Sequence, residues 1–519
     1  MFSISLLFIY LLSSSHTCEA YKVLVAYPLP AKSHSILGDG VVRHLLEAGN
    51  EVTYITTYPK SLQHPNLTEI DISSSKKLLP VNLINIEKIM KKETNIDDLS
   101  ILVKLFFNLQ VALLEHKDVR NFLSDPKEQF DVVIVEWMIL ELLTGISAVF
   151  NCPYILVSPV DPNWMILKLI DELPNPAYTG DLTSNNVVPF SFMGRLEELY
   201  KMIMGLGFQY FYVSGSVQKE YERLLVPIIR NRGHKVPNFD ELRYNASLIL
   251  GNSHVSMGQA TRLPQNYKDV GGYHVDTNVK ALPEDLKKLL ENSKQGLIYF
   301  SMGSNLRSEY MPAQLKVDLF KMFGKLKQTV LWKFEEDLPD RPSNVHIVQW
   351  APQQSILAHP NCVLFITHGG LLSTTEAIHF GKPIIGIPVF GDQFNNVDRA
   401  VKRGFAKRVD LSYTMADELE RVINDMIADF SYTTKVQQLS FVYHDRPVPP
   451  GKELAHWVHH VVRTAGAPHL RSPALMVPWY QKCYLDLAAL IIVILWTMMR
   501  VMNKIRTMFL KEQQKKKFL

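Results

Sequence analysis

A short stretch in the second half of the sequence holds side chains that could bind a charged nucleotide derivative. In chain order these residues are Trp350, Gln353, His368, Gly370, Ser373, Glu376, Asp392 and Gln393. A tryptophan face can stack on a base, and a carboxylate can accept hydrogen bonds from ribose hydroxyls. Glycines that precede a helix leave backbone N–H groups open to a phosphate. The residue types therefore suit a base, a ribose, a pyrophosphate and a set of sugar hydroxyls in turn.

The spacing also predicts local structure around the phosphate-binding part of this stretch. We expect Ser373 to cap a helix that starts after Gly370, so that unpaired N–H groups and the helix dipole face an anion. Glu376 lies three residues further on, on the same helix face. His368 adds a donor, which becomes cationic if a bound phosphate raises its pKa. Ser304 lies in a second turn, residues 301–305, which resembles another phosphate-approach loop.

Two successions of strands and helices surround these residues. The first half predicts strands at residues 22–26, 51–56, 131–135 and 154–158, with a helix at 34–48 ended by Gly49. The second half predicts strands at 296–300, 329–334, 346–349, 363–367 and 384–387, separated by helices within 312–327 and at 353–359 and 373–380. This rhythm predicts an α/β protein with two tandem Rossmann-like domains, residues 21–255 and 256–470, joined around 255–280. Ligands of such domains bind at the carboxyl ends of the strands, in the cleft between them.

The stretch from Trp350 to Gln393 resembles the donor-binding signature of the UDP-glycosyltransferases. The resemblance implies the two-domain GT-B fold, with Trp350 stacked on uracil and Gln353 on the nucleoside. It implies that His368, Gly370 and Ser373 meet the pyrophosphate and that Glu376 holds the ribose. Asp392 and Gln393 match the pair that binds sugar hydroxyls. Leu372 departs from the pattern, because many members carry asparagine there.

The same resemblance implies a catalytic base in the first domain. His34 follows the first strand and its proline turn, and it matches the family histidine that takes the acceptor proton. A carboxylate normally stands behind this base; Glu136 follows the strand Phe130–Val135 and is the favoured partner, with Glu141 as the alternative. No metal or other cofactor is expected, since helix N-termini, His368 and serines can meet the leaving-group charge. Attack from the face opposite UDP would invert the anomeric centre.

The two ends of the chain predict a membrane protein. Residues 1–20 resemble a cleavable signal peptide, and residues 480–502 are long and apolar enough for a transmembrane helix. The tail at 503–519 is basic and carries Lys516 and Lys517 in the position of a dilysine retrieval signal. We therefore expect a single-pass type I protein of the endoplasmic reticulum membrane with lumenal domains. Sequons at Asn66 and Asn245 are then candidates for glycosylation.

These features predict transfer of a hexose from a UDP-sugar to a hydroxyl of a small lipophilic acceptor. Glucose is the expected sugar because the signature looks invertebrate, and glucuronic acid is the alternative. A non-catalytic binding protein of the same fold is a second class. A nicotinamide oxidoreductase is a third, although no Gly-x-Gly-x-x-Gly turn follows the first strand. A net charge of +4 over 519 residues gives no indication of nucleic-acid binding, and a homo-oligomer stays open.

One further stretch allows several interpretations. Residues 195–215 are rich in aromatic side chains and methionine. Core packing, the lining of an apolar acceptor pocket and contact with the membrane each explain this composition.

Overall fold

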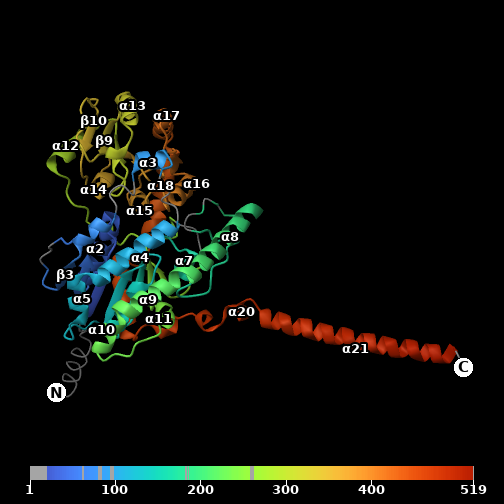
Figure 1. Ribbon diagram of the computed structural model, residues 1–519. Coiled ribbons are helices and arrows are strands. Elements are labelled where there is room, and N and C mark those ends of the chain that lie inside the picture. Colours follow the sequence, from blue (N-terminus) through green and yellow to red (C-terminus); the bar gives the residue numbers. More distant parts are fainter. Residues whose placement is uncertain are drawn as a thin grey trace, which may run out of the picture.

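The computed structural model describes residues 20–60, 64–79, 85–93, 99–181, 184, 186, 188–257, 262–276 and 278–517. The expected signal peptide, residues 1–20, lies outside the described residues except for Ala20. Within the described residues, two parallel β-sheets are each packed between helices (Figure 1). This arrangement confirms the α/β class and the tandem Rossmann-like domains expected from the sequence.

The first sheet has the strand order β3-β2-β1-β4-β5-β6-β7, with all described pairs parallel. Its central strands are runs of β-branched and aliphatic residues because both faces of the sheet are covered. Val23 and Val25 pack on one face, whereas Leu24 and Ala26 pack on the other. The strands are β1 (Lys22–Tyr27), β2 (Glu51–Thr56), β3 (Leu67–Asp71), β4 (Val132–Glu136), β5 (Tyr154–Ser158), β6 (Leu248–Gly251) and β7 (Tyr267–Asp269).

The helices that accompany this sheet vary widely in length. The first of them, α2, starts after Ala31, whose extended backbone forms the N-cap, and Gly49 follows its end at a positive φ of 85°. In chain order the helices of this half are α2 (Lys32–Glu47), α3 (Ile86–Met90), α4 (Leu99–Glu115), α5 (Lys117–Ser124), α6 (Gly145–Phe150), α7 (Trp164–Leu167), α8 (Phe192–Phe208), α9 (Ser214–Leu224), α10 (Val226–Asn231) and α11 (Phe239–Arg243). Of these, α3 packs on the second domain instead, where Ile86 is buried in the core (Figure 1).

The second sheet has the order β10-β9-β8-β11-β12-β13 and is also parallel. Its strands are β8 (Leu297–Ser301), β9 (Thr329–Lys333), β10 (Val345–Val348), β11 (Cys362–Thr367), β12 (Ile384–Gly386) and β13 (Ala406–Arg408). Its helices are α12 (Glu284–Asn292), α13 (Ala313–Gly324), α14 (Gln353–Ala358), α15 (Leu371–His379), α16 (Gln393–Lys402), α17 (Met415–Ala428) and α18 (Ser431–His444). The predicted strands and helices of this half therefore agree with the structure to within one or two residues.

After α18 the chain returns to the first domain. Helix α19 (Pro450–Arg463) packs against α2, and its residues Leu454, Val458 and Val461 belong to the same apolar cluster as Val23 and Val25 of β1. The chain thus passes from one domain to the other near residues 252–280 and again near 445–450. The domain limits expected from the sequence do not include this return. In addition, α3 of the first half packs in the core of the second domain (Figure 1).

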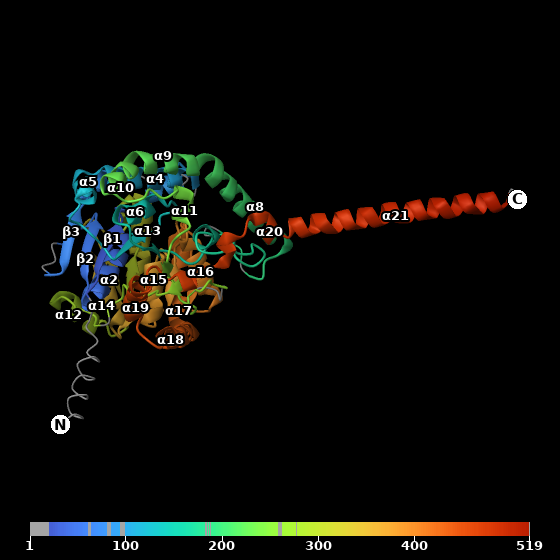
Figure 2. The same cartoon turned by 90° about the horizontal axis from the view of Figure 1, so that it is seen from below.

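The chain then leaves the folded body. The short α20 (Trp479–Lys482) is followed by α21 (Leu485–Lys517), which extends away from both domains (Figures 1 and 2). Residues Leu485–Gln514 of α21 are long and apolar enough to cross a membrane, and 0% of the most apolar window is buried. The helix begins at Leu485, later than the expected 480, because the chain turns at Tyr484, where φ is 55°.

Candidate functional site

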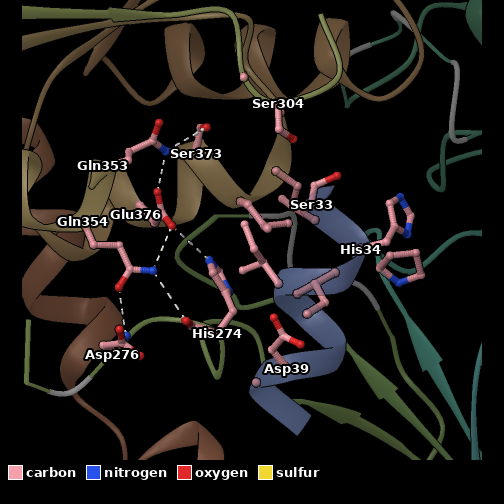
Figure 3. A pocket seen from close by; sticks show the side chains of 18 of the residues that line it. Ser33, His34, Asp39, His274, Asp276, Ser304, Gln353, Gln354, Ser373 and Glu376 are labelled. Carbon is pink, nitrogen blue, oxygen red and sulfur yellow. Dashed lines mark hydrogen bonds and ion pairs between the residues drawn. The ribbon is translucent and has the colours of Figure 1, made fainter. Parts of the chain in front are cut away.

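A cleft of about 1080 Å³ lies between the two domains. The carboxyl ends of β1, β8 and β11 all lead into it, as expected where strand order reverses in a doubly wound sheet. It brings together these residues predicted from the sequence: His34, Ser304, Trp350, Gln353, His368, Gly370, Ser373, Glu376, Asp392 and Gln393. In Figure 3 the residues Gln353, Ser373 and Glu376 lie on one side of α2 and His34 lies on its other side, with Ser33 between them.

His34 and Glu136 meet because β1 and β4 are neighbours in the first sheet. His34 lies in the first turn of α2, immediately after β1, and Glu136 is the last residue of β4. The Nδ1 atom of His34 contacts Oε1 of Glu136, whose side chain is fully buried. This contact leaves Nε2 of the imidazole as the ring nitrogen available to the cleft.

Glu141 does not contact His34. Glu141 follows β4 in the chain, and its side chain is buried. Burial raises the pKa of its carboxyl, although the positive charges of Lys168 and Arg243 oppose this shift. The structure therefore brings Glu136, and not Glu141, to the histidine.

The imidazole of His368 is held between two glycines. A Cβ atom at Gly303 would lie 2.5 Å from Cε1 of His368, and a Cβ at Gly370 would lie 2.6 Å from its Nε2. The two loops approach because β8 and β11 pair, with Ser301 opposite Thr367. Burial, and to a smaller extent the Lys333 ammonium, lower the pKa of His368 to about 4. In the structure the ring is thus neutral at pH 7 and can donate one hydrogen bond.

The expected cap at Ser373 is wrong. Helix α15 begins at Leu371, its N-cap is Gly370, and no side chain caps it. The extended backbone of Gly370, with ψ of 147°, turns the chain into the helix, so Ser373 lies inside the first turn. The expected consequence still holds, because the first N–H groups of α15 have no partner within the helix and lie beside His368 at the cleft.

Glu376 is the centre of a hydrogen-bond network. Gln353 Nε2 donates to Oε2 of Glu376 at 2.5 Å and to Ser373 Oγ at 3.1 Å, and Gln354 Nε2 donates to Oε1 of Glu376 at 3.1 Å (Figure 3). Ser373 and Glu376 therefore do share a helix face. Burial raises the pKa of Glu376 to about 7, although the hydrogen bonds from the two glutamines oppose this shift.

The segment that joins the domains also reaches this network. The backbone N–H of Asp276 donates to Gln354 Oε1 at 3.0 Å, and His274 Nε2 lies 3.7 Å from Oε1 of Glu376. Sequence reasoning missed Gln354, His274 and Asp276. Gln354 could have been found as the direct neighbour of Gln353, whereas nothing in the linker sequence sets His274 apart.

Trp350 is exposed to the cleft on a loop between β10 and α14. Its side chain has 52% of its area exposed, which is high for an indole and leaves a flat apolar surface for a ligand. The Lys32 ammonium of α2 lies 3.2 Å from the centroid of the indole. Burial lowers the pKa of Lys32, and Lys333, Lys60 and Lys76 lower it further. No sequence pattern connects Lys32 with Trp350.

Asp392 and Gln393 lie at the start of α16. Asp392 Oδ2 accepts a hydrogen bond from Asn396 Nδ2 at 2.9 Å, and burial raises the pKa of its carboxyl. Gln393 Oε1 accepts the N–H groups of Val389 and Phe390 at 2.9 and 3.2 Å. The fixed carbonyl leaves the Gln393 amide nitrogen as the group that can donate to a ligand.

The leucine that departs from the family signature has a structural role. Leu372 packs against the apolar cluster that β1, α2 and α19 form in the first domain. It also lines the cleft, so it joins the two domains beside the helix N-terminus. Close by, Asn305 Nδ2 donates to Ser33 Oγ at 3.3 Å, a second contact between the domains at the cleft.

Other predicted sites lie outside the cleft. Asn66 precedes β3, and Asn245 is exposed, with its carbonyl oxygen in contact with Arg471. Glycosylation at either remains a prediction. Over the described part of the chain, no group of three His, Cys, Asp or Glu side chains is placed to hold a metal ion.

Comparison with known proteins matches this chain to one family over almost its whole length. Residues 9–518 match the family described as UDP-glucoronosyl and UDP-glucosyl transferase. The chain is 33% identical over 498 residues to UDP-glycosyltransferase UGT5 of Dactylopius coccus, covering 94% of this chain and 92% of that protein. It is 31% identical over 493 residues to UDP-glucosyltransferase 2 of the same species, with coverages of 94% and 92%.

A solved structure shows the same fold at low sequence identity. Arabidopsis thaliana UGT89C1 complexed with UDP superimposes with a TM-score of 0.55 at 16% identity, over 85% of this chain and 100% of that chain. The fold is therefore GT-B. From the family match over almost the whole chain, this protein belongs to the UDP-glycosyltransferase family and is a glycosyltransferase that uses a UDP-sugar.

Proposed function

We propose that the protein transfers glucose from UDP-glucose to a hydroxyl of a small lipophilic acceptor, with inversion and with His34 as general base. The contact between His34 and the buried Glu136 at the cleft is the observation that carries this proposal. A carboxylate on Nδ1 fixes the tautomer whose Nε2 can take a proton, and it stabilises the imidazolium that results. The similarity to a UDP-glucosyltransferase supports glucose as the sugar.

The reaction follows from the positions of these groups. The acceptor oxygen attacks C1 of the sugar while its proton passes to Nε2 of His34. The bond between C1 and the β-phosphate oxygen breaks, and UDP leaves with the electron pair. The N–H groups that begin α15, the neutral His368 and Ser304 would meet the charge on the diphosphate. We assign no step to a metal ion.

Several residues would hold the donor for this step. Trp350 offers its exposed face to uracil, and Glu376 accepts hydrogen bonds from the ribose. The Gln393 amide donates to a sugar hydroxyl, and Asp392 accepts from another. The acceptor would enter from the side of the cleft on which His34 lies.

Glucuronic acid is the second candidate sugar, because the family that residues 9–518 match is described by both glucuronosyl and glucosyl transfer. In the placement given above, the Lys32 ammonium lies over Trp350, at the uracil end of the donor, and so it would not meet a carboxylate on the sugar.

Microsomes that contain the chain should transfer labelled sugar from UDP-glucose to a panel of phenols, and more slowly from UDP-glucuronic acid. His34→Ala should lower kcat by about 10²- to 10⁴-fold, the usual contribution of a general base, with UDP affinity nearly unchanged. His64→Ala is the matched control, because His64 also lines the cleft but is not placed with Glu136. Full activity in His34→Ala would disprove the assignment of the base, and faster transfer from UDP-glucuronic acid would reverse the choice of sugar.

We also propose that α21 anchors the protein in the endoplasmic reticulum membrane, with the two domains in the lumen. The support is the apolar span in α21 and the basic residues that follow it. Replacing Lys516 and Lys517 by serine should remove the retrieval signal. The variant should then acquire Golgi-type glycans and reach the cell surface, as measured by glycosidase sensitivity and microscopy. An unchanged location would show that these lysines do not retain the protein.

A further inference from the structure

Helix α8 turns its apolar side away from the protein. Its exposed residues recur every three or four positions and so form one face of the helix. They are Phe192, Met193, Leu196, Leu199, Tyr200, Ile203 and Met204. The next turn, a π-helix at Gln209–Val213, continues the face with Tyr210, Phe211 and Tyr212, each more than 70% exposed. A continuous apolar face of this length is unusual on a soluble surface and indicates a partner.

The opposite face of α8 makes specific contacts with the first domain. These contacts determine which side of the helix faces outward. The buried Glu198 accepts hydrogen bonds from Asp181 N at 2.7 Å and Asn186 Nδ2 at 2.7 Å, and it contacts Ser184 Oγ. Gly205 lies against Trp164, where an added Cβ would approach the indole to 2.6 Å. Rotating the helix to bury its apolar residues would break these contacts and would wedge Gly205 away from Trp164.

The position of α8 matches that of the candidate membrane span. Figures 1 and 2 are related by a rotation about the horizontal, and in both α21 extends nearly along that direction. In both views the outer, N-terminal end of α8 extends from the body toward the side on which α20 and the start of α21 lie. A bilayer crossed by α21 would therefore begin at about the level that the end of α8 reaches.

We propose that the apolar face of α8 lies in the surface of the same bilayer that α21 spans, as a second, monotopic contact. This inference rests on the proposed anchoring through α21. The two contacts would fix the orientation of the catalytic domains, because one spanning helix alone leaves them free to tilt.

The composition of the two segments favours a lipid surface over a protein partner. Tyrosine and phenylalanine alternate with aliphatic residues on α8, and Trp479, Tyr480 and Tyr484 are exposed just before α21. Aromatic side chains of this kind collect at the boundary between headgroups and acyl chains. None of the exposed residues on α8 lines the cleft, so the acceptor pocket does not account for them.

The test places a fluorescent label on single cysteines of the full-length chain in phosphatidylcholine vesicles. Cys483→Ser removes the exposed native thiol, and the label is attached at Tyr200→Cys on α8. Leu495→Cys on α21 reports the anchor, and Phe441→Cys on α18 is the matched control, since Phe441 is 73% exposed on a helix far from α21 in both views. Lipids with a nitroxide on the acyl chain quench labels that enter the bilayer.

We expect the label at position 200 to be quenched several-fold more than that at 441, and to lie at a shallower depth than that at 495. Quenching at 495 together with equal, weak signals at 200 and 441 would overturn the contact of α8 and leave the anchor intact. A label at 495 that is not quenched would overturn the anchor and this inference with it. Disulfide-linked dimers of the unlabelled Tyr200→Cys chain under oxidation, without quenching of the labelled chain, would instead identify the face as an interface between two copies.

Discussion

At the residue scale, Glu376 combines burial with a proposed role in donor binding. The ionised carboxylate of Glu376 is destabilised by the loss of water around it. Hydrogen bonds from the side-chain amides of Gln353 and Gln354 offset part of this cost. Ribose hydroxyls would supply the missing hydrogen bonds and so favour the ionised form. Binding of the nucleotide and release of a proton are therefore expected to be linked at this residue.

The linkage predicts how pH affects both stability and affinity. Folding raises the pKa of Glu376 from 4.5 to about 7. Between pH 4.5 and pH 7, the Glu376 carboxyl is therefore protonated in the folded protein but ionised in the unfolded chain. The free energy of unfolding should thus fall as pH rises from 4.5 to 7, and then level off. Affinity for UDP should rise between pH 6 and 8. Thermal unfolding and calorimetry at several pH values measure the two effects.

Glu376→Gln should remove both pH dependences and weaken UDP binding by about 10- to 100-fold, the worth of one or two hydrogen bonds to a charged group. Glu420→Gln is the control, since Glu420 pairs with Lys325 on the surface of the second domain. If Glu376→Gln binds UDP as tightly as the native chain at pH 8, the ribose assignment is wrong.

At the element scale, helix α2 connects His34, the proposed base, to the linker between the domains. His34 lies in its first turn, whereas Arg43 and His44 lie in its last turns. Arg43 contacts Asp276 and donates from Nη2 to Tyr273 O at 2.8 Å, and His44 Nε2 lies 2.9 Å from the same carbonyl. The position of His34 therefore depends on how closely α2 packs against the first sheet and the linker.

Gly38 permits the close approach of α2 to the first sheet. A Cβ at this position would lie 2.3 Å from Tyr54 Oη and 2.8 Å from Tyr27 Cγ, and both tyrosines are buried. Gly38→Ala should destabilise the fold by about 1–3 kcal/mol through overpacking, and it should lower kcat by moving His34. Urea unfolding and steady-state kinetics measure these effects.

Gly215→Ala in α9 is the matched control, because nothing lies within 4 Å of its Cβ. It should be neutral or stabilise by about 1 kcal/mol, the difference in helix propensity. Equal effects of the two substitutions would show that α2 can shift without cost.

The elements were predictable to different degrees for physical reasons. Strands such as β1 and β11 stand out because they are buried on both faces and so must be continuously apolar. The residues of the donor site lie close together in sequence, which made their shared role visible. His274 and Lys32, in contrast, reach the site only through the packing of the two domains, which leaves no local pattern. The choice between Glu136 and Glu141 required knowing that β4 ends at residue 136.

At the scale of the whole molecule, the two crossings between the domains lie side by side. Arg446, just after α18, donates from Nη2 to Gly271 O in the first crossing at 2.8 Å. Gly272 adopts a φ of 95°, and a Cβ there would lie 1.6 Å from Tyr443 Oη. The two segments are thus in direct contact, and glycine is required where they meet.

Gly272→Ala should destabilise the protein by about 2–4 kcal/mol, because strain from a positive φ adds to a steric clash. Gly233→Ala separates the two causes, since Gly233 has a φ of 75° but open space around its Cβ, and it should cost about 1 kcal/mol. Adding Tyr443→Phe to Gly272→Ala should recover part of the loss. Calorimetric unfolding of the three variants and the native chain measures these differences, and no recovery in the double variant would place the clash elsewhere.

Two adjacent crossings also limit how the enzyme can open. A single covalent connection would leave one domain free to swivel in any direction relative to the other. Two connections in contact at Gly271 and Arg446, together with α3, whose Ile86 lies in the core of the second domain, restrict that swivelling. The separation between His34 and the N-terminus of α15 would then be confined to a narrow range, so that each closure of the cleft returns the proposed base and the diphosphate site to the same alignment.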